Sequence, residues 1–239
     1  MVTYRPIKKW LLPLLSIIIG LAIGYTVFPS EQQHRLQVWE KALDIYENDN
    51  YAIETVYSRD DQLYSSSKGT WTNNRASYDV STPVSDDTNF NFTVYFMEDK
   101  IYVNSGEEWV YGERPHRLIQ EFIPLDQPFT WVRDLLKNAD EIMIEKADFA
   151  VIYRAYFKNF NDIEFRGVRL EEQKNTTLEM TIFNGQLDTI ELDAEPIRPK
   201  TVGPLVSYPE KLIYRLEFKS SDITNLELPA DANTSKELE

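Results

Sequence analysis

The chain has 239 residues, a formal net charge of −14 and no cysteine, and 42% of its residues are apolar. The apolar share excludes a disordered chain, and the missing cysteine excludes disulfides, thiolate metal sites, cysteine nucleophiles and an acylated lipoprotein cysteine. The acidic charge argues against nucleic acid as a partner, because phosphate backbones repel it. Many tyrosine, phenylalanine, valine, isoleucine and threonine residues in short alternating runs favour β structure.

Residues 10–28 form an uncharged apolar run near the N-terminus. At about 1.5 Å of rise per residue, a helix of this length crosses the roughly 30 Å hydrocarbon core of a membrane once. Arg5, Lys8 and Lys9 precede the run and Glu31 is the first charge after it, so the positive-inside rule keeps the N-terminus in the cytoplasm. The run therefore predicts a single-pass anchor in the cell membrane, with the rest of the chain outside.

Two further interpretations of this run stay open. Ala22 and Gly24 are small residues that could precede a cleavage site, which would make the run a signal peptide. Gly20 and Gly24 also have the spacing that lets two membrane helices approach closely, so the run could bind a partner helix. An exported domain without disulfides favours a bacterium of the Gram-positive type. The predicted parts are a cytoplasmic N-terminus (1–9), the anchor or signal peptide (10–28), an extracytoplasmic domain (29–230) and a flexible tail (231–239).

A helix is predicted directly after the apolar run. Ser30 is followed three residues later by Gln33, the capping-box pattern in which each side chain binds the other residue's backbone N–H. Leu36, Trp39 and Leu43 then recur at helical spacing and form one apolar stripe. Such a stripe requires a sheet to pack against, and its tryptophan is more typical of a core than of a ligand site.

Alternating apolar and polar residues predict strands in the next part of the chain, each with one wetter face. These strands cover residues 51–58, 69–80, 90–96, 101–103 and 109–111. The pattern changes to helical spacing over residues 115–138, where Asp126 before Gln127 and Pro128 is typical of a helix N-cap. We therefore expect a helical insert within an antiparallel β domain.

Strand patterns resume after the insert. They cover residues 141–145, 149–157, 177–183, 186–194 and 212–218, with a short edge strand at 223–228. Asn184 and Gly185 stand between two of these runs, which is the strongest short-range signal for a hairpin. Residues 159–174 have a mixed period that fits a short helix or a loop, and the prolines in residues 195–208 predict a loop.

No catalytic or metal-binding motif stands out in the sequence. His34 and His116 lack partners at the spacing that a zinc site needs, and no nucleophile elbow, phosphate-binding glycine loop or calcium loop is present. Carboxylate pairs are abundant in so acidic a chain, so none of them marks an acid–base site. The sequence therefore predicts a protein that is not an enzyme and uses no cofactor or metal.

Aromatic residues on the inner face of the predicted sheet are the more informative feature. A curved sheet with aromatic side chains on one face either packs helices there or leaves an apolar cavity. The residues that we expect to line such a cavity are Trp39, Phe90, Phe92, Phe96, Trp131, Phe157, Tyr214 and Phe218. The alternative, a completely filled core, stays open at this stage.

The order of these elements resembles the lipoprotein-carrier family typified by LolA and LppX. The resemblance lies in the hairpin of residues 92–103 with Trp109, the hairpin of residues 178–192, and the end of the domain at residues 212–229. It implies an α+β, β-rich fold, in which a strongly curved antiparallel sheet, a half-barrel, has helices packed on its concave side. In this chain we expect a transmembrane helix to precede that fold. This chain departs from the family in lacking the lipobox cysteine, and a fixed anchor would prevent shuttling.

In that family the cavity between sheet and helices binds acyl chains. The resemblance therefore implies a membrane-anchored, extracytoplasmic and non-catalytic module that binds a hydrophobic ligand, such as a lipid or the acyl chains of a lipoprotein. The alternative is a regulatory or interaction subunit of another membrane protein, such as a sensor kinase or a cell-envelope enzyme. Bound lipid and a preformed apolar cleft would favour the first hypothesis, and co-purification with a membrane protein would favour the second.

Overall fold

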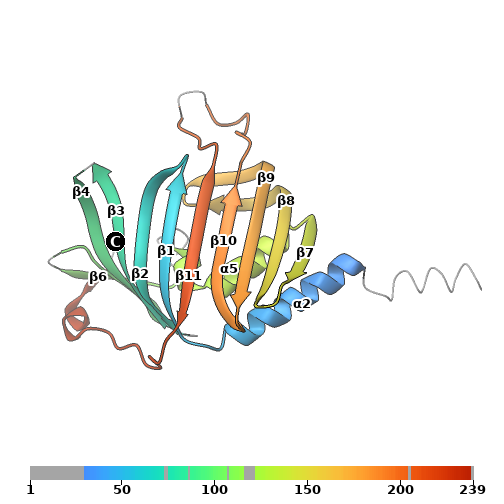
Figure 1. Cartoon of the computed structure of the whole chain (residues 1–239). Coiled ribbons are helices and arrows are strands. Elements are labelled where there is room, and N and C mark those ends of the chain that lie inside the picture. The colour runs from blue at the N-terminus through green and yellow to red at the C-terminus, as the bar shows by residue number, and fades with distance from the viewer. Residues whose placement is uncertain are drawn as a thin grey trace, which may run out of the picture.

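The computed structural model describes residues 30–72, 75–85, 87–106, 108–115, 122–203 and 206–237, apart from the side chain of residue 162. Among these residues, twelve strands form one continuous, curved and unclosed sheet (Figure 1). Its strand order is β12-β6-β5-β4-β3-β2-β1-β11-β10-β9-β8-β7, and all neighbours are antiparallel except the parallel pair of β12 and β6. This arrangement agrees with the predicted β-rich class and its curved sheet.

Two meanders of hairpins make up the sheet. The first meander contains β1 (Tyr51–Arg59), β2 (Gln62–Thr72), β3 (Arg75–Ser85), β4 (Thr88–Phe96), β5 (Lys100–Asn104) and β6 (Trp109–Glu113). The second contains β7 (Glu141–Lys146), β8 (Ala150–Phe165), β9 (Val168–Phe183), β10 (Gln186–Ala194) and β11 (Leu212–Ser220). Strands β1 and β11 pair along their whole length and join the two meanders in the middle of the sheet.

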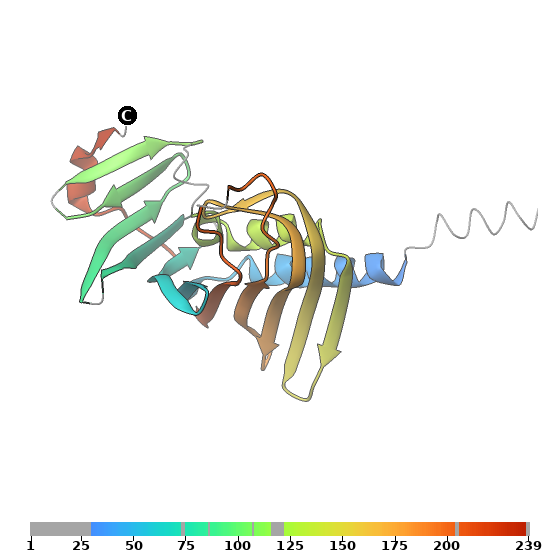
Figure 2. The ribbon, with the colours of Figure 1, turned by 90° about the horizontal axis from the view of Figure 1, so that it is seen from above.

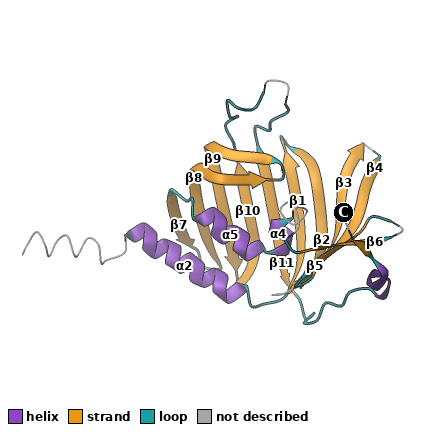
Figure 3. Ribbon diagram, turned by 180° about the vertical axis from the view of Figure 1, so that it is seen from behind, coloured by secondary structure: helices purple, strands orange, loops and turns teal. Residues whose placement is uncertain are grey.

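Among the described residues, three α-helices lie on the concave side of the sheet: α2 (Glu31–Tyr46), α4 (Ile123–Asp126) and α5 (Pro128–Leu136). They lie over β1 and β7–β11, which we call the covered half (Figure 3). The remaining strands, β2–β6 with the short β12 (Lys236–Glu237) beside β6, form the open half, where α4 reaches β3 but no described α-helix lies along β4–β6. Seen from above, the two halves of the sheet diverge on either side of β1 and β2 (Figure 2).

The first helix begins as its sequence predicts. The backbone N–H of Gln33 donates to Ser30 Oγ at 3.2 Å, and the backbone N–H of Ser30 donates to Gln33 Oε1 at 2.9 Å. Its N-terminal turn is fixed to the edge strand β7, because the Ile142 backbone N–H donates to Gln32 Oε1 and Arg35 Nη1 donates to the Ile142 carbonyl. The helix therefore covers one edge of the sheet.

The turn at Asn184 and Gly185 confirms the predicted hairpin between β9 and β10. Both residues have a positive φ, 51° for Asn184 and 78° for Gly185, which a two-residue hairpin turn requires and which these residue types tolerate. The long strand predicted at residues 212–218 is also present, as β11. Loop structure predominates in the proline-containing segment 195–208, which contains one isolated bridge, from Gln173 to Pro196.

Several predicted elements were wrong. The run 69–80 is not one strand but the end of β2 and the start of β3, which are adjacent in a hairpin and keep the same alternation. Asp126 does not cap α5: it ends α4, and its buried carboxylate pairs with Arg114. Residues 223–228 form no strand. The segment after them contains a 3₁₀ helix (Ala230–Thr234) and β12 (Lys236–Glu237), which run from the end of the predicted domain into the predicted tail (231–239).

Residues 159–174 are mostly the extended ends of β8 and β9 rather than a helix or a loop. Their register shifts between Phe157 and Asn159 and again between Asn159 and Ile163, so the apolar and polar residues lose their simple alternation. The hairpin bends over the concave side at its upper end (Figure 1). Its tip, Arg166 and Gly167 with φ of 47° and 74°, thereby reaches strands of the first meander.

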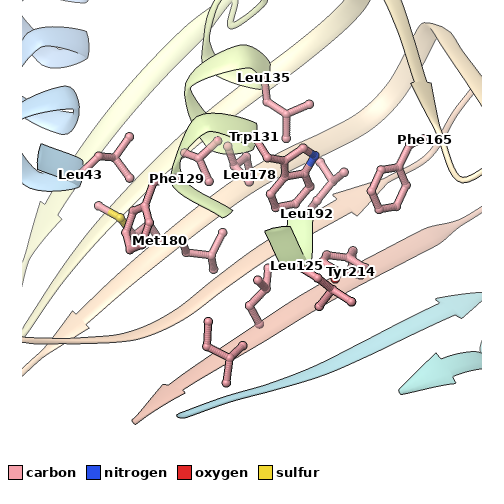
Figure 4. Packing of buried hydrophobic residues seen from close by; sticks show 14 of the residues in the cluster. Leu43, Leu125, Phe129, Trp131, Leu135, Phe165, Leu178, Met180, Leu192 and Tyr214 are labelled. Atoms are coloured by element: carbon pink, nitrogen blue, oxygen red, sulfur yellow. The ribbon is translucent and has the colours of Figure 1, made fainter. Parts of the chain in front are cut away.

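The core lies between the helices and the covered half (Figure 4) and continues into the open half through buried residues such as Tyr78, Phe96 and Ile101. Phe129 of α5 is fully buried and packs within 5.2 Å of the ring centre of Trp71 and 6.1 Å of that of Phe218. Trp131 of the same helix lies 5.5 Å from the Tyr214 ring and 5.9 Å from the Phe165 ring. Phe129 and Trp131 of α5 thus pack against aromatic rings of β2, β11 and β8 on the concave face.

The structure describes no helix that is both long and apolar enough to cross a membrane. The predicted anchor, residues 10–28, and the predicted cytoplasmic segment, residues 1–9, lie outside the described residues. Their placement stays a prediction from the sequence.

Candidate functional site

A pocket of about 350 Å³ opens on the concave face of the open half. Its volume is at the small end of the roughly 300–1,000 Å³ that is typical of ligand pockets. Strands β1–β4, the residue before α4, and the tip of the β8–β9 hairpin supply its walls. The residues that line it are Arg59, Tyr64, Ser65, Val80, Thr82, Phe90, Phe92, Phe122 and Arg166.

One wall of this pocket is apolar. In the β3–β4 pair Val80 stands opposite Phe92 and Thr82 opposite Phe90, so all four side chains share one face. The Phe92 ring centre lies 5.7 Å from that of Phe90 and 5.8 Å from that of Phe122. Phe90 keeps 49% of its surface exposed. An apolar ligand would therefore find a partly preformed, water-accessible surface here.

The opposite wall carries two arginines. Arg59 Nε donates to the Tyr57 hydroxyl at 2.7 Å, and Arg59 Nη2 donates to the Arg166 backbone carbonyl at 2.6 Å. Arg166 Nη1 donates to Ser65 Oγ at 2.5 Å, while its Nε is buried and makes no hydrogen bond within the described structure. These bonds hold the end of β1 and the hairpin tip together, and they fix both guanidinium groups at the pocket.

Aromatic rings support the two guanidinium groups. The Tyr57 ring centre lies 5.3 Å from Arg59 Cζ and 4.9 Å from Arg166 Cζ, and the Tyr64 ring centre lies 4.2 Å from Arg59 Cζ. Such stacking stabilises a cation. Burial raises the pKa of the Tyr57 hydroxyl, and the two guanidinium groups only partly oppose this rise. Tyr57 therefore stays neutral and supplies no counter-charge.

No acidic side chain is among the described residues that line the pocket. Within the described structure, no ion pair includes Arg59 or Arg166, although Arg114, Arg133 and Arg154 all pair with carboxylates. This is unusual in a chain with 39 acidic residues against 25 lysines and arginines, in which carboxylates are plentiful. The arrangement leaves two fixed positive charges beside an apolar wall.

The structure distributes the eight predicted cavity residues over different places. Phe90 and Phe92 line the pocket described above. Trp131 lines a second pocket of about 360 Å³ between α5 and the β8–β9 hairpin, together with Leu135, Ile163 and Phe165. The remaining five are buried in the core and line neither pocket: Trp39, Phe96, Phe157, Tyr214 and Phe218.

Sequence reasoning missed Arg59 and Arg166. Arg59 ends a strand whose alternation identifies only its apolar face, and Arg166 lies in the segment with mixed period. The available signal was the Arg166-Gly167 dipeptide between the apolar residues Phe165 and Val168, which is a turn pattern. Nothing in the sequence alone indicates that this turn reaches Ser65, which is 101 positions away.

Neither histidine belongs to this pocket. His34 is exposed on α2, and His116 lies outside the described residues. Within the described part of the chain, no group of three histidine, aspartate or glutamate residues could hold a metal ion. No protein-family model matches the chain, and a search of the curated proteins finds no match either.

Proposed function

We propose that the chain is a non-catalytic binding module that is tethered outside the cell membrane and holds a hydrophobic ligand, such as a lipid or an acyl chain of a lipoprotein. The single observation that carries this proposal is the pocket formed by Val80, Phe90, Phe92 and Phe122. A partly exposed aromatic surface on a concave face favours an apolar ligand, because covering it removes apolar area from water.

The location of the pocket also supports the proposal. The helices cover the concave face of the covered half, where Leu125 and Phe129 are fully buried. No described α-helix lies along β4–β6 (Figure 3), and the inward Phe90 of β4 keeps 49% of its surface exposed. A volume of about 350 Å³ accommodates a segment of an acyl chain rather than a whole lipid. The rest of the ligand would extend past Phe90 and Tyr64, which are 49% and 47% exposed.

The curved sheet with helices on its concave side is compatible with a half-barrel of the lipoprotein-carrier type, and we propose this relationship at the level of the fold. The uncharged run at residues 10–28 would hold the domain at the outer surface of the membrane of a Gram-positive-type bacterium. A tethered module of this kind would receive or present a lipid at that surface.

Photolabelling tests the proposal on the full chain in membranes. A fatty acid with a photoreactive group near its methyl end should label the wild-type chain, and peptide mapping should place the label in β3, β4 or the segment that contains Phe122. Thr82→Trp fills the pocket and should lower this labelling about tenfold, since it occupies the volume that the acyl chain needs. Ser81→Trp is the matched control, because Ser81 is the neighbouring residue on the opposite face of β3. Equal labelling of the two variants, or no label on these segments, would refute the proposal.

A regulatory or interaction subunit remains a second candidate, favoured by exposed aromatic side chains away from the pocket. Phe149 and Phe183 are 69% and 50% exposed, and both lie at the end of the β8–β9 pair where the Asn184 backbone N–H donates to the Phe149 carbonyl. Exposed aromatic residues are typical of protein contacts. If this function is the main one, a Phe149→Ser and Phe183→Ser double variant should lose co-purification with a membrane protein, while Thr82→Trp keeps it.

A further inference from the structure

Arg59 and Arg166 form a positively charged wall of the pocket. This wall bears on the head group that a ligand would carry in addition to its apolar chain. Hydrogen bonds to Tyr57, Ser65 and the Arg166 backbone fix the two guanidinium groups before any ligand binds. Arg166 also lies against Tyr214, whose ring centre is 5.5 Å from its Cζ, and no acidic side chain lines the pocket among the described residues. Two guanidinium groups that are held in place and have no described carboxylate partner therefore stand at one end of the pocket.

Guanidinium groups select particular chemistry. Their planar fork binds two oxygens of a carboxylate or phosphate at once, and such charge-assisted hydrogen bonds are about twice as strong as neutral ones. Neither arginine forms an ion pair within the described structure, and no acidic residue lines the pocket. Two partly buried positive charges that are close together repel each other, so an anion that binds there would relieve this repulsion.

We infer that the pocket binds an amphiphile whose anionic head group, a carboxylate or a phosphate, is held by Arg59 and Arg166 while its chain lies over Val80, Phe92 and Phe122. This inference rests on the proposed function and narrows it to one class of ligand. The charge complementarity also explains how a chain of net charge −14 would attract an anionic lipid. The local field of the two arginines opposes the general repulsion over the short distance at which the head group docks.

Native mass spectrometry of the full-length protein, released from a nonionic detergent, measures separately how the head group and the oleoyl chain of a ligand contribute to its affinity. Three probes share one oleoyl chain: oleate carries a carboxylate, oleoyl-lysophosphatidate a phosphate, and monoolein no charge. Inorganic phosphate is the fourth probe and has no chain. The wild-type chain should bind at least one anionic amphiphile about tenfold more tightly than monoolein, since its head group gains charge-assisted hydrogen bonds. Preference between oleate and the lysophosphatidate identifies the head group.

Substitutions then assign the effect to the two arginines. Arg166→Gln and Arg59→Gln should each remove most of the preference over monoolein, because that preference depends on their charge-assisted hydrogen bonds. Arg166→Lys keeps the charge but loses the fork, so it should retain part of the preference. Arg75→Gln is the matched control, because Arg75 is half-buried, donates to the Leu226 carbonyl, and does not line the pocket. Thermal unfolding of each variant identifies those that fail to fold, and the comparison is made with the folded ones.

The possible results separate this inference from the proposed function. If monoolein binds as tightly as both anionic amphiphiles, the pocket is a site for acyl chains without head-group selection, and only the inference is wrong. If inorganic phosphate binds as tightly as the lysophosphatidate, the arginines form a plain anion site and the inference is wrong. If no oleoyl compound binds, both the inference and the proposed function fail.

Discussion

The covered and open halves of the sheet have the same alternation of residues but different exposures. In the covered half the inward residues Ile190, Leu192 and Leu216 are fully buried under α2, α4 and α5. In the open half Phe90 and Phe92 stand in equivalent inward positions, and Phe90 is about half exposed. Alternation of apolar and polar residues therefore indicates which face of a strand points inward. Whether that face is buried in the core or lines a pocket depends on the helices and side chains that cover it.

The helix layer and the pocket use their arginines differently. Arg133 of α5 pairs with Asp44 of α2 and with Glu47 at its C-terminal end, so these ion pairs join the two helices. At the pocket, Arg59 of β1 and Arg166 of the β8–β9 hairpin tip are held by neutral partners only, within the described structure. The first arrangement pairs its charges, and the second leaves two guanidinium groups without a described carboxylate partner.

Replacement of Phe129 should give the largest loss of stability. Phe129→Ala removes a fully buried ring between Trp71, Tyr51 and Phe218 and should cost about 3–5 kcal/mol of unfolding free energy. Phe92→Ala in the open half should cost less than half as much, because that ring is only partly buried. Urea unfolding followed by tryptophan fluorescence measures both. Equal costs would contradict the distinction between a filled and an accessible half.

The ion pair of Arg114 and Asp126 joins the end of β6 to α4 and so links the two halves. Both guanidinium Nη atoms lie 2.7 Å from the two carboxylate oxygens, and the Asp126 carbonyl also accepts from Trp71 Nε1. Asp126→Asn leaves the Arg114 charge without its partner. We expect a cost of about 2–3 kcal/mol, below the roughly 3–5 kcal/mol of a fully buried pair, because the Arg114 side chain is 20% exposed.

Asp134→Asn is the matched control for this ion pair. The Asp134 carboxylate is 55% exposed and pairs with Lys137, so its loss should cost less than about 1 kcal/mol. A similar cost for both variants in urea unfolding would show that the pair between β6 and α4 does not stabilise the junction.

Gly69→Ala tests the packing of the open half more finely. A Cβ atom at Gly69 would lie 1.9 Å from the Ser77 carbonyl oxygen and 2.6 Å from Tyr78 Cδ1, so β3 would have to move away from β2. We expect a cost of about 1–3 kcal/mol in the same urea experiment. Gly203→Ala meets no atom within 4 Å and should leave stability unchanged or slightly raised. An unchanged Gly69→Ala variant would show that the open half adapts to extra volume.

Local signals in the sequence predicted local structure well. The capping box at Ser30 and the turn at Asn184 and Gly185 each depend on a few adjacent residues, and both are present. Alternation also identified the faces of β1, β4 and β11, because one face of β1 and of β11 is largely buried and the inward face of β4 is apolar. The β8–β9 hairpin was missed since its register shifts and its bend over the sheet break the period of two.

The candidate pocket could be predicted only in part. Phe90 and Phe92 follow from alternation within β4, which is a property of one strand. Arg59, Phe122 and Arg166 come from three other segments and meet only because the hairpin bends across the concave face. Phe96 and Phe218 also stand on the inward faces of their strands, but other side chains cover them, so they belong to the core and not to the pocket. Long-range packing, rather than residue type, decides between these outcomes.

The pairing of β1 with β11 has a consequence for the order in which the sheet assembles during folding. Each meander consists of neighbours in sequence and can form as soon as its own residues emerge. The β1–β11 pairing joins residues 51–59 to residues 212–220, so the sheet becomes continuous only when its last long strand arrives. A chain that stops before Leu212 would leave β1 and β10 with bare backbone N–H and carbonyl groups. Completion of the chain through β11 therefore protects the domain against edge-to-edge pairing with other copies of itself.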